Sequence, residues 1–308
     1  MIKRVALAMT VLLGMLAAPF CVAGGVNVVA SIKPVHALVA GVMQGVAEPK
    51  LLLQGGASPH DFSLRPADAR AIYEADLVFW VGEQLESFLT RMLPSTKARN
   101  VALAQAPGVE LLALREGGLW DEDGHQPDHQ PDHQHRTGDY DPHIWLDPHN
   151  AVAMVRAIRA ALMELDPSHR DRYRANAAAL IVRLQALDAA LAERLASIKG
   201  KPYIVFHDGY QYFERRYGLA AVGAVTLNPE KKTGARRVSE IRRRINENRI
   251  VCVFSEPQFK PALVQVLIEN TSVRTGVLDP LGGTLPAGPD SYFQLMNKLA
   301  DNLHACLA

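Results

Sequence analysis

Short apolar runs rich in β-branched residues alternate with stretches of helical periodicity along most of the chain. Strands that alternate with helices are typical of parallel sheets with helical crossovers. The pattern therefore predicts an α/β fold, each half being a mostly parallel sheet flanked by helices. The predicted strands are 26–32, 50–54 and 76–82 in the first half and 203–207, 220–226, 250–254 and 274–279 in the second. Helices are predicted at 34–46, 66–75 and 149–164, and later at 209–216, 235–247, 260–270 and 291–305.

A long uninterrupted helical pattern lies between the two halves. Asp166 is a suitable N-cap, Pro167 suits the first helical position, and Gly200 suits the C-terminal cap. No glycine or proline interrupts residues 168–199, and apolar residues recur there every three or four positions. A single helix of this length spans roughly 48 Å. Two ordinary helices with an unseen break are the alternative.

This helix sets the predicted domain organisation. We expect an N-terminal lobe over residues 24–165, a linking helix over 166–200 and a C-terminal lobe over 201–308. One long rigid helix would then join the two lobes and leave a cleft between them.

The N-terminus has the features of a secretory signal over residues 1–23. Lys3 and Arg4 form a positive start, a short apolar core follows, and small residues precede a cleavage point after Ala23. The apolar run is too short for a membrane span. The sequence therefore predicts export to the periplasm as a soluble protein, with a lipid anchor on Cys21 as the less favoured alternative.

Removing this segment leaves two cysteines, Cys252 and Cys306. An even number in an oxidising compartment suggests a disulfide, and two buried free thiols are the alternative. A bridge would place residues 252–306 in one domain.

The charge balance argues against a nucleic-acid partner. The chain carries 33 basic and 32 acidic residues, a net charge of +1. The basic run 236–249 has helical spacing and is interpreted as a solvated helix face, with partner docking as the weaker alternative.

Histidines provide the candidate chemistry. His60 follows one predicted strand, while His207 and Asp279 close two others. In open α/β sheets, ligands bind outside the carboxyl ends of the strands. His143 precedes the helix predicted at 149–164. Three imidazoles and a carboxylate form a tetrahedral set suited to zinc, although any one of these histidines alone is more often structural.

Three motifs carry a resemblance to a known family. The stretches "GASPHDFSLRPADARAIYEADLVFWVGEQLE", "DPHIWLDPHNA" and "YIVFHDGYQYFERRYGL" resemble those of the ZnuA family, the periplasmic zinc-binding receptors of bacterial ABC importers. The resemblance implies two α/β lobes joined by one long helix. It implies that His60, His143 and His207 bind zinc in the cleft between the lobes. It also implies a disulfide that fits Cys252 and Cys306.

The sequence departs from the family at one position. Some members have a glutamate directly before the first ligand histidine, where this chain has Pro59. Proline offers no donor atom, so the fourth ligand is either Asp279, which matches the aspartate of the wider family and is the favoured ligand, or water. Manganese-binding relatives tend to have a carboxylate in place of His207, which favours zinc.

A histidine-rich stretch occupies residues 117–139. It repeats "HQPD", and the part from residue 121 has no aliphatic residue, so it cannot bury enough apolar surface to fold. We predict a mobile loop that is either a weak accessory zinc site or a solvated insertion. Its candidate ligands are His125, His129, His133 and His135.

The expected function is therefore a monomeric, non-enzymatic zinc receptor. It would deliver zinc to the membrane permease of an ABC importer that works with a cytoplasmic ATPase. A manganese receptor or metal-dependent adhesin of the same fold is the first alternative. A zinc hydrolase is the second, but the sequence has no H-E-x-x-H, G-x-S-x-G or P-loop motif.

Overall fold

The computed structural model describes residues 25–115, 139–227, 234–247, 249–260 and 262–308. The predicted signal segment 1–23 lies outside the described residues. So do the four histidines of the predicted loop at positions 125, 129, 133 and 135.

The first lobe contains a parallel four-stranded sheet in the order β2-β1-β3-β4. Its central strands are fully buried, as their apolar runs predict. The strands are β1 (Val28–Ala30), β2 (Lys50–Leu51), β3 (Leu77–Trp80) and β4 (Arg99–Ala102). The accompanying helices are α1 (Lys33–Met43), α2 (Pro66–Tyr73) and α3 (Ser87–Thr90).

The second lobe repeats this topology. Its sheet has the order β6-β5-β7-β8, so the second, first, third and fourth strands of the lobe lie side by side, as they do in the first lobe. All neighbouring strands are parallel. The predicted α/β class is confirmed. The strands are β5 (Tyr203–His207), β6 (Ala221–Thr226), β7 (Cys252–Ser255) and β8 (Arg274–Val277). The helices are α6 (Gln211–Tyr217), α7 (Ala235–Glu247) and α8 (Ala262–Ile268).

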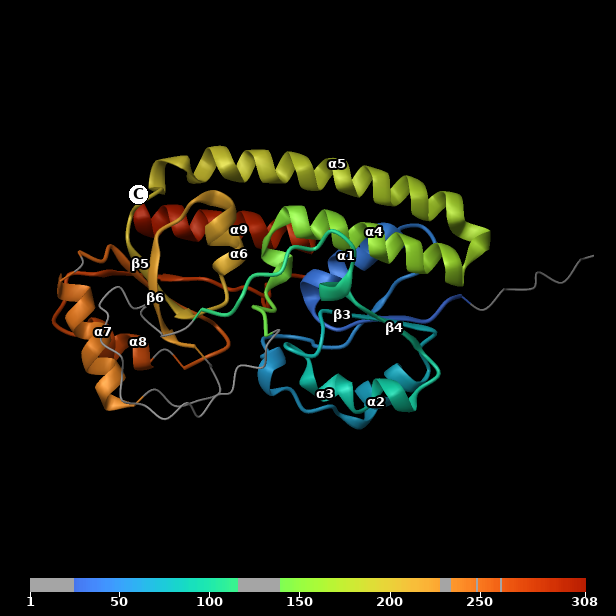
Figure 1. The fold of residues 1–308 in the computed structure, drawn as a ribbon, viewed down its shortest axis with the longest axis horizontal. Coiled ribbons are helices and arrows are strands. Elements are labelled where there is room, and N and C mark those ends of the chain that lie inside the picture. The colour runs from blue at the N-terminus through green and yellow to red at the C-terminus, as the bar shows by residue number, and fades with distance from the viewer. Residues whose placement is uncertain (1–24, 116–138, 228–233, 248, 261) are drawn as a thin grey trace, which may run out of the picture.

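The predicted long helix runs along one side of both lobes (Figure 1). It follows α4 (Pro148–Leu165) and consists of α5 (Arg170–Leu195) with a 3₁₀ turn at each end. The whole stretch, Pro167–Ile198, has the length and composition of a membrane span. Its apolar stripe nevertheless packs against other helices of the fold, as the buried side chains of a core helix do. The buried residues of α5 are Tyr173, Ala177, Leu180, Leu184, Leu187, Leu191 and Leu195.

The C-terminal helix α9 (Ser291–Leu307) forms a second bridge between the lobes. It packs against β8 in the second lobe, against α1 in the first, and against α5. The main hydrophobic core is therefore continuous from one lobe to the other. The sequence predicted only one bridging helix, because periodicity shows which face of α9 is apolar but not which lobes cover that face.

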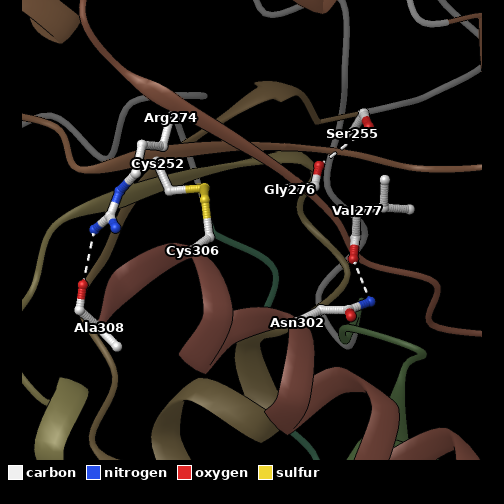
Figure 2. Close-up of a disulfide and its surroundings, with 8 residues drawn as sticks. All are labelled: Cys252, Ser255, Arg274, Gly276, Val277, Asn302, Cys306 and Ala308. Atoms are coloured by element: carbon white, nitrogen blue, oxygen red, sulfur yellow. Dashed lines mark hydrogen bonds between the residues drawn. A yellow bond between two sulfur atoms is a disulfide. The ribbon is translucent and has the colours of Figure 1, made fainter.

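A disulfide joins Cys252 of β7 to Cys306 of α9, with a Cα–Cα distance of 6.1 Å, as predicted. Two of the hydrogen bonds drawn in Figure 2 connect the C-terminal segment to β8. Asn302 donates to the Val277 carbonyl, and Arg274 donates to the Ala308 carbonyl. These contacts fix α9 on the edge of the second sheet.

Candidate metal centre

Three histidines reach the cleft from separate elements. His60 lies in a 3₁₀ turn that follows β2, and its backbone N–H donates to the Ser58 hydroxyl. His143 stands directly before a 3₁₀ turn that leads into α4. His207 is the last residue of β5. Two of the three therefore come from the first lobe and one from the second.

The three imidazoles converge on one point. One ring nitrogen from each lies within 4.8 Å of the other two. The Nε2 atoms of His143 and His207 are 3.2 Å apart. Two nitrogens that bind the same tetrahedral zinc at 2.0–2.1 Å should be separated by about 3.3 Å. The spacing therefore suits a shared zinc ion.

Two buried carboxylates orient two of these rings. Asp141 Oδ1 lies 2.7 Å from His143 Nδ1, and Glu256 Oε1 lies 2.6 Å from His207 Nδ1. With the protons on Nδ1 facing the carboxylates, both Nε2 atoms direct lone pairs toward the centre. A hydrogen bond from a carboxylate to the outer nitrogen is the usual support of a metal-bound histidine.

The third histidine has an unpartnered nitrogen. Nε2 of His60 is buried and has no hydrogen-bond partner among the described residues. Burial, and then the nearby rings of His143 and His207, lower the pKa of His60 to about 2. The His60 ring is thus neutral at physiological pH. A buried polar atom without a partner is rare in proteins, and a bound cation would satisfy it.

The pKa of His207 moves in the opposite direction. Burial alone would lower it, but the charge and hydrogen bond of Glu256 outweigh burial and raise the pKa above its ordinary value of 6.5. Protons would therefore compete with a metal for the His207 ring.

A glycine leaves room at the point of convergence. A Cβ added at Gly209 would lie 2.4 Å from His207 Nε2 and 3.1 Å from His143 Nε2. The Cβ atom of any other residue at this position would thus occupy the space beside the two Nε2 atoms.

Apolar side chains enclose this point. Trp145 is fully buried, and its indole N–H donates to the Pro280 carbonyl of the other lobe. Phe259 and Leu281 line the same cavity. This lining limits the access of water, which strengthens electrostatic interactions inside the cavity.

The structure does not bring Asp279 into the histidine group. Its Oδ1 accepts hydrogen bonds from the Gln258 amide and from two backbone N–H groups, and its Oδ2 accepts one from Gly283 N. The carboxylate is therefore engaged by its own loop. Pro59 is buried in the cavity wall.

Sequence reasoning did not single out Asp141 and Glu256. A signal was present for each. Asp141 precedes His143 by two residues, the spacing at which a side chain accepts from the local backbone, and it accepts from His143 N. Glu256 follows β7 directly, at the same sheet edge as His207.

Comparison with known families shows to which family the chain belongs. The chain matches the family described as "Zinc-uptake complex component A periplasmic", ZnuA, over residues 28–306. The chain belongs to the ZnuA family. Among its ZnuA relatives, the high-affinity zinc uptake system protein ZnuA of Brucella suis is 44% identical, with 92% of each chain covered. The protein of the same description from Yersinia pestis is 38% identical, with 95% of this chain and 94% of the relative covered.

Solved structures of the ZnuA class share the fold. A crystal structure of ZnuA aligns with a TM-score of 0.78 at 23% identity, covering 92% of this chain and all of the other. The laminin-binding protein Lmb of Streptococcus agalactiae, described as having adhesin and metal-transporting activity, aligns with a TM-score of 0.76 at 25% identity and the same coverage. The Zn(II)-bound ZnuA-like domain of Streptococcus pneumoniae AdcA aligns at 0.70 and 26% identity, covering 92% and 99%.

Proposed function

We propose that this chain captures zinc in the periplasm as the receptor of an ABC importer for zinc. Membership in a family of periplasmic zinc-uptake components supports this function. The observation that carries it is the convergence of three imidazole nitrogens within 4.8 Å of one another, in a cleft between two lobes.

In this proposal the zinc ligands are Nε2 of His143, Nε2 of His207 and a ring nitrogen of His60. All three are neutral donors when zinc is bound, since metal binding requires deprotonated ligands. Asp141 and Glu256 fix the tautomers and supply negative charge behind the rings. The buried carboxylates thus offset the charge of the incoming ion without binding it.

We assign the fourth position to water rather than to Asp279. A ligand role for Asp279 would require its carboxylate to leave four hydrogen bonds, three of them from backbone amides of its own loop. Loss of those bonds would leave these part-buried N–H groups without their partner, at a cost of up to about 1–3 kcal/mol each. A three-histidine site with one water suits a cargo ion that must later be released.

The receptor would act as a monomer and pass its zinc to a membrane permease served by a cytoplasmic ATPase. A zinc hydrolase would need a base poised beside the metal-bound water. Both carboxylates nearest the histidines are instead occupied with Nδ1 atoms. An assay of purified, zinc-loaded protein for peptidase and esterase activity should give no turnover.

The proposal is tested by titrating zinc against a chelator of known affinity. We expect one tight site in the wild-type protein and a loss of more than about 100-fold in His207→Ala. His304→Ala is the matched control, because His304 lies on α9 and only approaches the Ser197 hydroxyl. Equal losses in both variants, or tighter binding of manganese than of zinc, would refute the proposal.

A further inference from the structure

The residues after β8 form a strap, defined here as residues 279–285, that reaches from the second lobe to the first. The Asp279 carboxylate accepts hydrogen bonds from the backbone of the strap itself. Asp279 Oδ1 accepts from Leu281 N at 3.1 Å and from Gly282 N at 3.0 Å, and Oδ2 accepts from Gly283 N at 2.7 Å. Successive backbone N–H groups that surround one anion form a rigid nest. The carboxylate thus fixes the backbone of the strap.

A lysine from the other lobe holds the opposite side of the strap. Lys33 begins α1, directly beyond β1, and is only 7% exposed. Its Nζ donates to the carbonyls of Gly282, Gly283 and Leu285 at 2.7–2.8 Å. An ammonium group has three donors, and the strap accepts all of them. This contact ties the second lobe to the start of a first-lobe helix.

The strap also lies against the loop that carries His60. A Cβ added at Gly283 would be 3.1 Å from Gly56 Cα and 3.2 Å from the Gly55 carbonyl oxygen. Such distances mean that the two backbones are already in close contact, so a Cβ at position 283 would press the Gly55–Gly56 backbone away by a few tenths of an ångström. Gly55 and Gly56 lie between β2 and the turn that contains His60.

His60 has a particular need for such support. Asp141 and Glu256 orient the rings of His143 and His207. Among the residues that the structure describes, no carboxylate does this for His60, whose backbone N–H donates to the Ser58 hydroxyl. The position of its ring therefore depends on the backbone of its loop and on what packs against that loop.

We propose that the strap positions His60 for zinc from across the cleft, with Lys33 and Asp279 as positioning residues that hold the strap in place. This inference rests on the proposed zinc site. It gives Asp279 a role other than that of a ligand. It also makes the geometry of the site depend on the docking of the two lobes, because the strap belongs to one lobe and His60 to the other.

The test is chelator-competition titration of zinc in Lys33→Met and Gly283→Ala. Each should weaken zinc binding about 10- to 100-fold, the range found when groups that support a ligand are removed. The matched controls are Lys201→Met and Gly234→Ala. Lys201 donates to the Leu307 carbonyl, away from the cleft, and a methyl group at Gly234 would meet no atom within 4 Å. Both controls should bind zinc as the wild type does.

A second arm separates positioning from general damage. His60→Ala is combined with Gly283→Ala, and zinc binding is measured against a weaker chelator. If the strap acts through His60, Gly283→Ala should cause no further loss in the His60→Ala background, because the effects of coupled residues are not additive. Gly283→Ala carries this arm even if Lys33→Met fails to fold.

Four results would be decisive. Strap variants that bind zinc like the controls would overturn the inference, and so would an equal loss with and without His60. A wild-type protein with no tight zinc site would instead refute the proposed function. Loss in the strap variants that disappears in the His60→Ala background would support the positioning role.

Discussion

At the residue scale, zinc binding at this site requires space for one ion between three nitrogens. Gly209 keeps that space open, since a Cβ there would lie within 2.4 Å of His207 Nε2. Gly209→Ala should therefore weaken zinc binding by more than about 100-fold, comparable to loss of a ligand. Chelator competition measures the loss. Gly234→Ala is the control, and unchanged affinity in Gly209→Ala would contradict the placement of the ion.

As the pH falls, protonation of His207 should weaken zinc binding at a pH at which His60 is still neutral. The raised pKa of His207 means that its proton is held up to a pH above 6.5, so zinc must displace it there. The pKa of His60 is about 2, so this ring stays neutral throughout. Affinity should be full at alkaline pH and fall as the pH drops through the raised pKa of His207.

The matched variant for this prediction is Glu256→Gln. An amide oxygen still accepts the Nδ1–H hydrogen bond, but the negative charge that raises the pKa of His207 is gone. The fall in zinc affinity should therefore begin at a lower pH than in the wild type. Titrations at a series of pH values measure the midpoint, and an unmoved midpoint would show that another group controls the pH dependence.

The sequence located the three histidines but not the neighbours that set their chemistry. Strand ends and a family resemblance are visible along the chain, and they selected His60, His143 and His207. The same strand-end rule selected Asp279. Whether a carboxylate at that edge faces a metal or turns into its own loop depends on backbone conformation, and four N–H donors to Asp279 are apparent only in three dimensions.

At the element scale, the disulfide that joins β7 to α9 can be tested directly. The disulfide closes a loop of 54 residues. In the chain-entropy model such a loop contributes about 4 kcal/mol to stability. Replacing both Cys252 and Cys306 by alanine should lower the melting temperature clearly while leaving zinc affinity unchanged, because neither sulfur approaches the histidines. Loss of zinc binding in the double variant would contradict this separation.

The stability that the disulfide contributes can be compared with that of a single hydrogen bond beside it. Asn302→Ala removes only the donation to the Val277 carbonyl. Its cost should be about 1 kcal/mol, well below that of the double cysteine variant. Thermal melting of both variants should show the smaller decrease in melting temperature for Asn302→Ala.

Most elements followed from the hydrophobic pattern, and the exceptions have a physical reason. The strands β1 and β3 are apolar throughout, and β5 and β7 are apolar up to their last residues, His207 and Ser255, so their runs were visible. Strand β4 begins with two exposed residues, Arg99 and Asn100, at the edge of its sheet, and it lacks that signal. Helix α3 has only four residues, which is too short for a helical period to appear.

At the scale of the whole molecule, the two lobes are held by more than one connection. Helices α5 and α9 both bridge them, Lys33 binds the strap, and Arg115 pairs with Asp208 and Glu214 at 2.7 Å. Hinge closure requires a few residues that absorb large backbone changes between otherwise free domains. These contacts leave little room for such a motion.

We therefore expect zinc to compact the protein only slightly. Small-angle scattering of the zinc-free and zinc-loaded protein should give radii of gyration that agree within the error of the measurement. A decrease typical of receptors that close around their ligand would show that the bridging helices permit a hinge.

The measurement that tests the central claim most directly is diffraction from crystals of the zinc-loaded protein on both sides of the zinc absorption edge. We expect one anomalous peak in the cleft, within about 2.1 Å of nitrogens from His60, His143 and His207, with a water in the fourth position. A peak bonded to Asp279, or a main peak away from these three histidines, would contradict it.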